Sequence, residues 1–199
     1  MRTQFSGTLL LLGVSLRALG AQATVSVTPP PLEEQVTQAV LPLPAEMRAH
    51  ASVLGYSPEG KLTLLRTGTG SMTCLANDPH GARFHVACYH KSLEPFMDRG
   101  RVLRAQGVKG DMVDSVRFRE ARAGTLKLPD APALLYSLTG AKDAYDPATK
   151  TAKARALFVV YMPYATSETT GLSAVPAEGT PWVMFPGTPK AHIMFVPKM

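Results

Sequence analysis

Residues 71–90, SMTCLANDPHGARFHVACYH, determine how this chain folds. Both halves of the stretch are rich in strand-forming residues, and Asp78-Pro79-His80-Gly81 between them is a turn signal. When the halves pair about residue 81, Cys74 lies directly opposite Cys88, within reach of a disulfide bond. The stretch therefore predicts an antiparallel hairpin closed by a Cys74–Cys88 disulfide.

Further strand-like and helix-like segments flank this hairpin. The predicted strands are 51–56, 61–66, 71–76, 83–90, 133–138, 156–162, 182–185 and 191–196. We expect the first four to form a β-meander. Two helices, one capped by Ser92 and ending at Gly107 and one capped by Asp111 and ending at Gly124, interrupt the strands. The pattern predicts an α+β fold: a largely antiparallel β-sheet of about seven or eight strands with an inserted helical pair and one disulfide.

Residues 1–23 have the features of a cleavable signal peptide. Arg2 precedes the apolar run Leu9–Val14, and Ala21-Gln22-Ala23 fits the small-x-small pattern of a cleavage site. The apolar run is shorter than the roughly 20 residues that a membrane-spanning helix needs. We expect cleavage after Ala23 and a soluble, secreted or periplasmic mature chain without a transmembrane segment. In such an oxidising compartment, the two cysteines are expected to be bonded.

The remaining chain has the length of one domain. A Pro-rich arm with a short helix, residues 24–50, is expected to precede a single α+β domain over residues 51–199. Loss of Arg2 and Arg17 with the leader lowers the formal charge from +6 to +4. A charge this small, without any recognition motif, argues against nucleic acid as a partner.

Three of the five histidines, His80, His85 and His90, fall within eleven residues. On a strand, His85 and His90 project to opposite faces, so they are not expected to share a metal ion. His85, Tyr89 and His90 are candidate ligand-binding residues because they lead into a strand-to-helix junction, where binding sites are common. The alternative is that His80 is a turn residue and His85 an ordinary sheet residue.

The last predicted hairpin holds a possible metal site. When its strands pair about Thr188, Met184 lies opposite His192 and Trp182 opposite Met194, all on one face. Two thioethers and an imidazole suit Cu(I) or Ag(I), and an indole ring can cover such an ion. The alternative is a hairpin buried on both faces, in which methionines fill gaps in the core.

The common catalytic motifs of hydrolases, nucleotide-binding enzymes and zinc proteases are absent from the sequence. The long segment 163–181 follows a buried strand, and Tyr161 and Tyr164 at its start are candidate ligand-binding residues. Four carboxylates fall in predicted loops and could support hydrolysis: Asp78, Asp143, Asp146 and Glu168.

Three functions are compatible with these patterns. The leading expectation is a non-enzymatic exported domain that binds a protein of the cell envelope or a small ligand. The alternative is a periplasmic protein that binds Cu(I) or Ag(I) through Met184, His192 and Met194 beneath Trp182. The third is a hydrolase-like enzyme with its site near segment 163–181.

Overall fold

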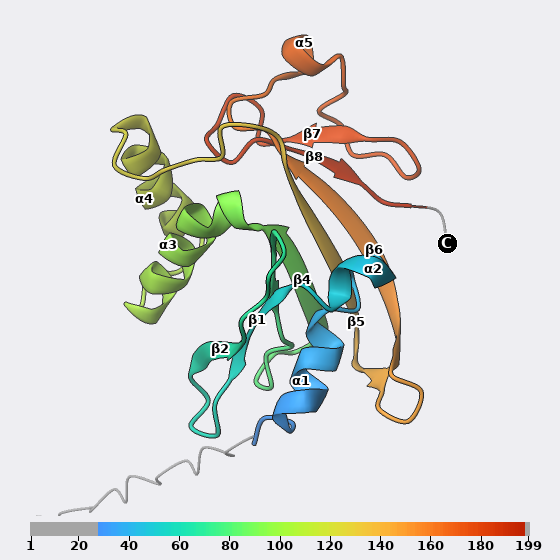
Figure 1. Cartoon of the computed structure of the whole chain (residues 1–199). Helices are drawn as coiled ribbons and strands as arrows, with labels where there is room; N and C mark the ends of the chain where they lie inside the picture. Colours follow the sequence, from blue (N-terminus) through green and yellow to red (C-terminus); the bar gives the residue numbers. More distant parts are fainter. Residues whose placement is uncertain (1–27, 198–199) are drawn as a thin grey trace, which may run out of the picture.

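The computed structural model of the chain describes residues 28–197 (Figure 1). The predicted leader and its cleavage site lie outside the described residues. The strands are β1 (Ser52–Tyr56), β2 (Leu62–Arg66), β3 (Met72–Leu75), β4 (Phe84–His90), β5 (Ala133–Asp146), β6 (Thr151–Tyr161), β7 (Trp182–Met184) and β8 (His192–Phe195). The helices are α1 (Leu32–Ala39), α2 (Ala45–Arg48), α3 (Glu94–Ala105), α4 (Asp111–Arg122) and α5 (Ser167–Thr170), with a 3-10 turn at Lys91–Leu93.

All eight strands belong to one sheet, in the order β2-β1-β3-β4-β5-β6-β8-β7. Every neighbouring pair is antiparallel except β1 and β3, which are parallel. This confirms the α+β fold with a largely antiparallel sheet, an inserted helical pair and one disulfide. Within residues 28–197, no helix combines the length and the apolar character needed to cross a membrane.

The predicted β-meander is wrong at its second step: β1 and β2 pair as expected, but β3 pairs with β1 and not with β2. After β2, the chain crosses closely over the residues that lead into β1. A side chain on Gly68 would meet the backbone of His50, Ala51 and Ser52 at 2.3–2.4 Å. The amide of Gly70 donates to the carbonyl of His50 at 2.7 Å. Glycine at the crossing therefore lets the chain return on the other side of β1.

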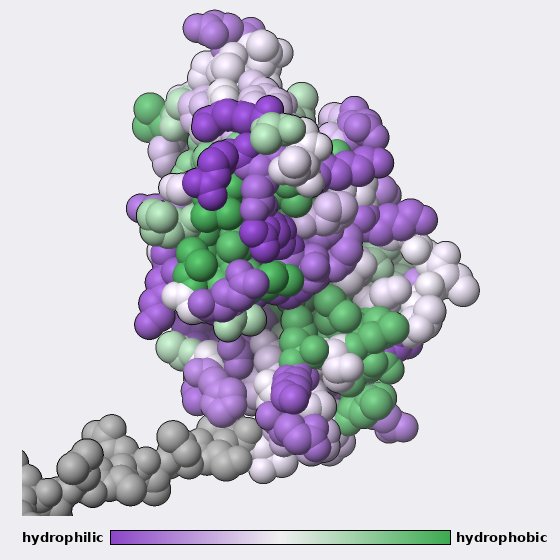
Figure 2. All heavy atoms as spheres, turned by 90° about the vertical axis from the view of Figure 1, so that its left-hand side faces the viewer, coloured by the Kyte–Doolittle hydropathy of each residue, from purple (hydrophilic) through white to green (hydrophobic). Residues whose placement is uncertain are grey.

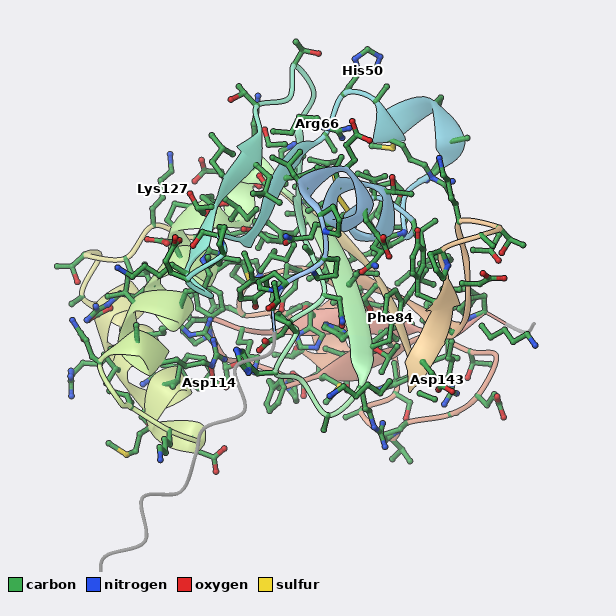
Figure 3. The ribbon with its side chains drawn as sticks, turned by 90° about the horizontal axis from the view of Figure 1, so that it is seen from below. His50, Arg66, Phe84, Asp114, Lys127 and Asp143 are labelled. Atoms are coloured by element: carbon green, nitrogen blue, oxygen red, sulfur yellow. A yellow bond between two sulfur atoms is a disulfide. The ribbon has the colours of Figure 1, made fainter. Side chains whose placement is uncertain are left out.

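Helices cover both faces of the sheet. Helices α1 and α2 lie together on one side, as the view from below shows (Figure 3), and α1 contributes Ala39 to a core that also contains Val53. Helices α3 and α4 pack on the opposite face, where Phe96 joins a second core with Tyr89 and Val159. Each core is thus formed between one face of the sheet and its own helices.

The disulfide is present at the predicted register. Cys74 pairs with Cys88 across β3 and β4, and the two sulfur atoms are bonded. Both cysteines are fully buried, as are Phe84 and Val86 on the same face of β4. The bridge therefore points into the core beneath α1.

The predicted helix caps are wrong in detail. Ser92 lies in the 3-10 turn before α3, and its amide donates to the side chain of His90. Asp111 is the first residue of α4, preceded by Gly110 at the cap position with φ 56°. Since an Asp at the first helical position already faces the positive end of the helix dipole, no side-chain cap is needed there. Gly124, with φ 72°, ends α4 in the left-handed conformation as predicted.

Strands β5 and β6 extend beyond their predicted bounds into a long hairpin. Asp143 and Asp146 therefore lie in β5 and not in a loop. Tyr145 near its tip stacks on Phe84, with ring centroids 6.1 Å apart. The hairpin tip is largely exposed, so its residues are polar and resemble a loop in sequence.

The surface formed by β2, α3 and α4 has no single continuous apolar area. Figure 2 shows hydrophobic residues in two areas on this side, with hydrophilic residues between them. Leu64 on β2 and Met112 on α4 are among the exposed apolar side chains of these elements.

Candidate functional site

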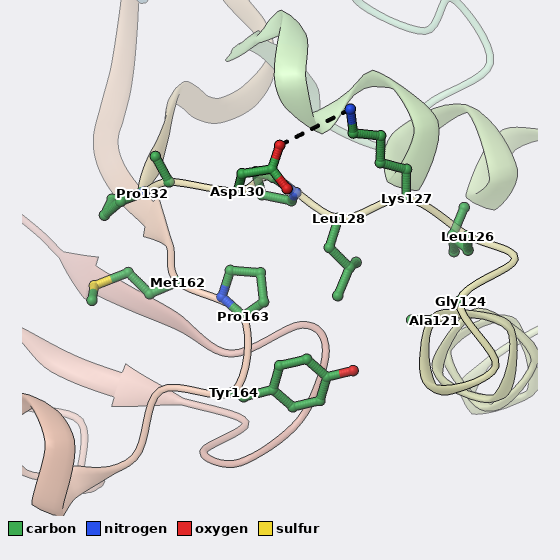
Figure 4. Close-up of a pocket in the computed structure, with 12 residues that line it drawn as sticks. Ala121, Gly124, Leu126, Lys127, Leu128, Asp130, Pro132, Met162, Pro163 and Tyr164 are labelled. Atoms are coloured by element: carbon green, nitrogen blue, oxygen red, sulfur yellow. Dashed lines mark ion pairs between the residues drawn. The ribbon is translucent and has the colours of Figure 1, made fainter.

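A cleft of about 530 Å³ lies between two segments that leave the helical pair and the sheet (Figure 4). One wall is the connection from α4 to β5, and the other is Met162-Pro163-Tyr164, directly after β6. Most of its lining side chains are apolar: Ala121, Leu126, Leu128, Pro129, Ala131, Pro132, Met162 and Pro163. The volume falls in the range of about 300–1,000 Å³ that is usual for small-molecule sites.

Tyr164 lies at this cleft in a strained backbone conformation. Its φ is 65°, which is unfavourable for a bulky residue by about 1–2 kcal/mol. The backbone holds it there, because the Tyr164 amide donates to the carbonyl of Thr188 at 2.8 Å and the Ala165 amide donates to that of Met162 at 3.0 Å. The side chain stays 45% exposed, and in Figure 4 its ring lies across from Leu128. Retained strain of this kind is concentrated at functional sites.

The polar groups of the cleft are few. Lys127 and Asp130 form a weak ion pair at 4.0 Å, and both side chains are largely exposed. Figure 4 shows this pair on the outer side of the connecting segment, away from Tyr164. The hydroxyl of Tyr164 is a further polar side-chain group among the lining residues.

A partly buried polar network connects α4, which leads into one wall of the cleft, with the turn before β8. Asp114 on α4 accepts hydrogen bonds from Arg117 on the same helix and from Lys190, just before β8, at 2.8 Å from the Lys190 Nζ. Arg117 is 4% exposed and also donates to the carbonyl of Phe96 at 3.1 Å. Figure 3 labels Asp114 on the helical pair.

Tyr161 and His192 lie next to this network, paired across β6 and β8. Their ring centroids are 5.0 Å apart, and both residues are buried. Burial raises the pKa of Tyr161 to about 12 and lowers that of His192, so both are neutral at pH 7. Burial alone would raise the pKa of Asp114, but hydrogen bonds from Lys190 and Arg117 lower it below the usual value.

The other predicted ligand-binding residues lie elsewhere. The hydroxyl of Tyr89 is 2.8 Å from Glu94 and 2.9 Å from Arg101, in the core beneath α3. His85 is within 2.8 Å of the hydroxyl of Thr139. His90 contacts Ser92 at 2.8 Å and lines a second hollow of about 440 Å³. Of the five candidates, Tyr164 lines the 530 Å³ cleft and Tyr161 lies directly before the wall that Met162 begins.

The carboxylates considered for hydrolysis do not converge. Asp78 accepts from the amide of His80 in a turn, and Asp146 from that of Ala148 at the β5–β6 hairpin. Glu168 accepts a hydrogen bond from Thr166 at the start of α5. Asp130 is the carboxylate that lines the cleft.

The β7–β8 hairpin has the predicted register. Trp182 pairs with Met194 and Met184 with His192, so these four residues share one face. Among residues 28–197, no group of three or more His, Cys, Asp or Glu side chains is arranged to hold a metal ion. Any metal site on this hairpin would thus depend on thioether ligands.

The connection from α4 to β5 and the Asp114–Lys190 pair were not predicted from the sequence. The connection has no helical or strand periodicity, and the closely spaced Pro129 and Pro132 are its one visible signal. Comparisons with protein-family models, with curated proteins and with solved structures found no match to this chain.

Proposed function

We propose that this protein binds a small, mainly apolar organic molecule in the cleft between the α4–β5 connection and Tyr164. The observation that carries the proposal is the strained, half-exposed Tyr164 at the edge of an apolar cleft. A bulky residue with positive φ lowers stability, so its retention is best explained by what its side chain does there.

The chemistry of the cleft favours binding over catalysis. Its walls supply apolar contacts, and each square ångström of apolar surface removed from water contributes about 25 cal/mol to binding or folding. The Tyr164 hydroxyl can donate or accept one hydrogen bond, and Lys127 lies at the rim. The expected ligand therefore has an apolar body and one polar end.

We also propose that the protein acts outside the cytosol, as a secreted or periplasmic protein, after cleavage following Ala23. The Cys74–Cys88 bond supports this, because structural disulfides persist mainly in oxidising compartments. N-terminal sequencing of the protein from its native host should find Thr24 as the first residue. A chain that starts at Met1 and stays in the cytosol would contradict the proposal.

Binding can be tested with the fluorescent apolar anion 1-anilinonaphthalene-8-sulfonate. The wild-type protein should bind one equivalent saturably, and Tyr164→Ala should weaken binding about tenfold or more. Phe185→Ala is the matched control, because Phe185 is also an exposed aromatic residue with positive φ, 52°, but does not line the cleft. Equal affinity in wild type and Tyr164→Ala, or no saturable binding by the wild type, would refute the cleft as the site.

A further inference from the structure

We propose that the β7–β8 hairpin binds one soft monovalent cation, Cu(I) or Ag(I), through His192, Met184 and Met194, with Trp182 covering the ion. None of these four residues lines the cleft, so this site does not rest on the proposed function. The four side chains are adjacent on one face of two strands.

The register puts the four side chains within reach of one ion. Met184 pairs with His192 and Trp182 with Met194, which makes a two-by-two array on one face of the sheet. Directly opposed residues have Cβ atoms about 4.5–5.5 Å apart, and diagonal ones about 7–8 Å. Thioether and imidazole side chains are long enough to converge over the centre of such an array.

The hydrogen bond of His192 fixes which ring nitrogen is free. Its Nδ1 lies 2.7 Å from the carbonyl oxygen of Lys190. A carbonyl oxygen can only accept, so Nδ1 carries the proton and Nε2 keeps its lone pair. Metal-binding histidines are commonly oriented in this way by a second-shell carbonyl.

The neighbouring aromatic rings hold the ring of His192 in place. His192 is 6% exposed, and its ring lies near those of Tyr161 and Phe185, with centroids 5.0 and 5.7 Å away. The ring is thus preorganised as a nitrogen ligand.

The nearby positive charge is only partly compensated, because Lys190 and Arg117 share the single carboxylate of Asp114. Lys190 is the cation closest in sequence to His192, and its Nζ lies 2.8 Å from Asp114 and 4.6 Å from the ring centre of Phe185. Arg117 is bonded to the same carboxylate. A monovalent ion at the hairpin therefore meets less repulsion than a divalent one would.

Trp182 supplies an independent indication. It is 7% exposed, and its indole nitrogen has no hydrogen-bond partner within residues 28–197. An indole face attracts a cation held beneath it.

The donor set selects soft ions. Thioethers prefer Cu(I) and its chemical analogue Ag(I), whereas hard cations such as Mg²⁺ and Ca²⁺ prefer carboxylate and carbonyl oxygens. None of the four residues is acidic. The competing explanation is that Met194 only fills the core, since it packs against the cluster that contains Tyr161 and Val159.

Titration with silver nitrate in chloride-free buffer separates these explanations. Trp182 is the one tryptophan, so its fluorescence reports directly on the site. The full chain should bind one equivalent of Ag(I), counted by native mass spectrometry, with a change in fluorescence. Met184→Leu should weaken binding about tenfold or more, and Met184→Leu combined with Met194→Leu should abolish the fluorescence change.

Met112→Leu is the matched control, because Met112 is 61% exposed on α4 and belongs to neither strand of the hairpin. It should bind Ag(I) as the wild type does. Circular dichroism of the leucine variants checks that they are folded, as expected for substitutions that conserve volume. No binding by the wild type, or undiminished binding by the folded double variant, would overturn the proposal.

Discussion

Asp114 accepts a hydrogen bond from Lys190 at 2.8 Å, although the two residues are 76 positions apart in the sequence. The pair connects α4, which leads into one wall of the cleft, with the turn before β8. In that turn, the carbonyl of Thr188 accepts the amide of Tyr164, on the other wall. One carboxylate therefore links both sides of the cleft.

Replacement of Asp114 by Asn should destabilise the protein by about 3 kcal/mol, because it leaves Arg117 and Lys190 without their shared anion. This loss of stability is at the low end of the range expected for breaking a buried ion pair, because the Asp114 side chain is still 23% exposed. The free energy of unfolding in urea measures the effect. Asp130→Asn is the control and should cost less than about 1 kcal/mol, because that ion pair is exposed. Equal losses in the two variants would contradict the structural role of Asp114.

Removal of the disulfide by Cys74→Ala with Cys88→Ala should lower the free energy of unfolding. The bond closes a loop with a sequence separation of 14, which is worth roughly 3 kcal/mol by the chain-entropy model. A reducing agent should destabilise the wild type and leave the double variant unchanged. Sensitivity of both to the reductant would show that the bond is not the cause.

Tyr164→Gly should be more stable than Tyr164→Ala by about 1 kcal/mol, because glycine adopts a positive φ without a steric cost. Both variants lose the aromatic ring, so both should lose the bound probe. Thermal unfolding, followed by circular dichroism, compares them. If the alanine variant equals or exceeds the glycine variant in stability, the backbone at Tyr164 is not strained.

Stability should fall as the pH rises above 10. Burial raises the pKa of Tyr161 and of Tyr56 to about 12, from an unfolded value of 10. Above pH 10 the unfolded chain releases these protons and the folded chain retains them, so unfolding is favoured as the pH rises towards 12. The stabilisation is fully present below pH 10. Urea unfolding between pH 8 and 11 should show a shallower decline for Tyr161→Phe than for the wild type, and parallel curves would exclude this contribution.

Contacts between segments adjacent in sequence could be predicted. Cys74 and Cys88 are equidistant from the turn at residue 81. A hairpin about this turn therefore predicts that the two cysteines are paired, as they are in the structure. The same symmetry about Thr188 gave the pairing of Met184 with His192. In both hairpins, the turn itself fixes which residues are opposed.

Contacts between distant segments could not be predicted. The strand orders β1-β2-β3 and β2-β1-β3 bury the same faces of these strands. The periodicity of residues 51–76 therefore does not show that β3 pairs with β1 in parallel. Likewise, Asp114 and Lys190 each resemble an ordinary surface charge in the sequence. Tyr164 could be proposed from its place at a strand end, but the opposite wall of its cleft, residues 124–132, depends on how the helical pair packs.

The core beneath α1 has a consequence for the order of folding. Its fully buried members all fall between Ala39 and Cys88, so the first half of the described chain holds a nearly complete core and both sulfur atoms. We predict that α1 and β1–β4 consolidate before β5–β8, because contacts between residues close in sequence require less loop closure. Pulse-labelling hydrogen exchange should find amide protection first in residues 32–90, and earlier protection of β6 and β8 would reverse this order. A chain that emerges from a translocation pore with its N-terminus leading could thus form its cross-link before its second half arrives.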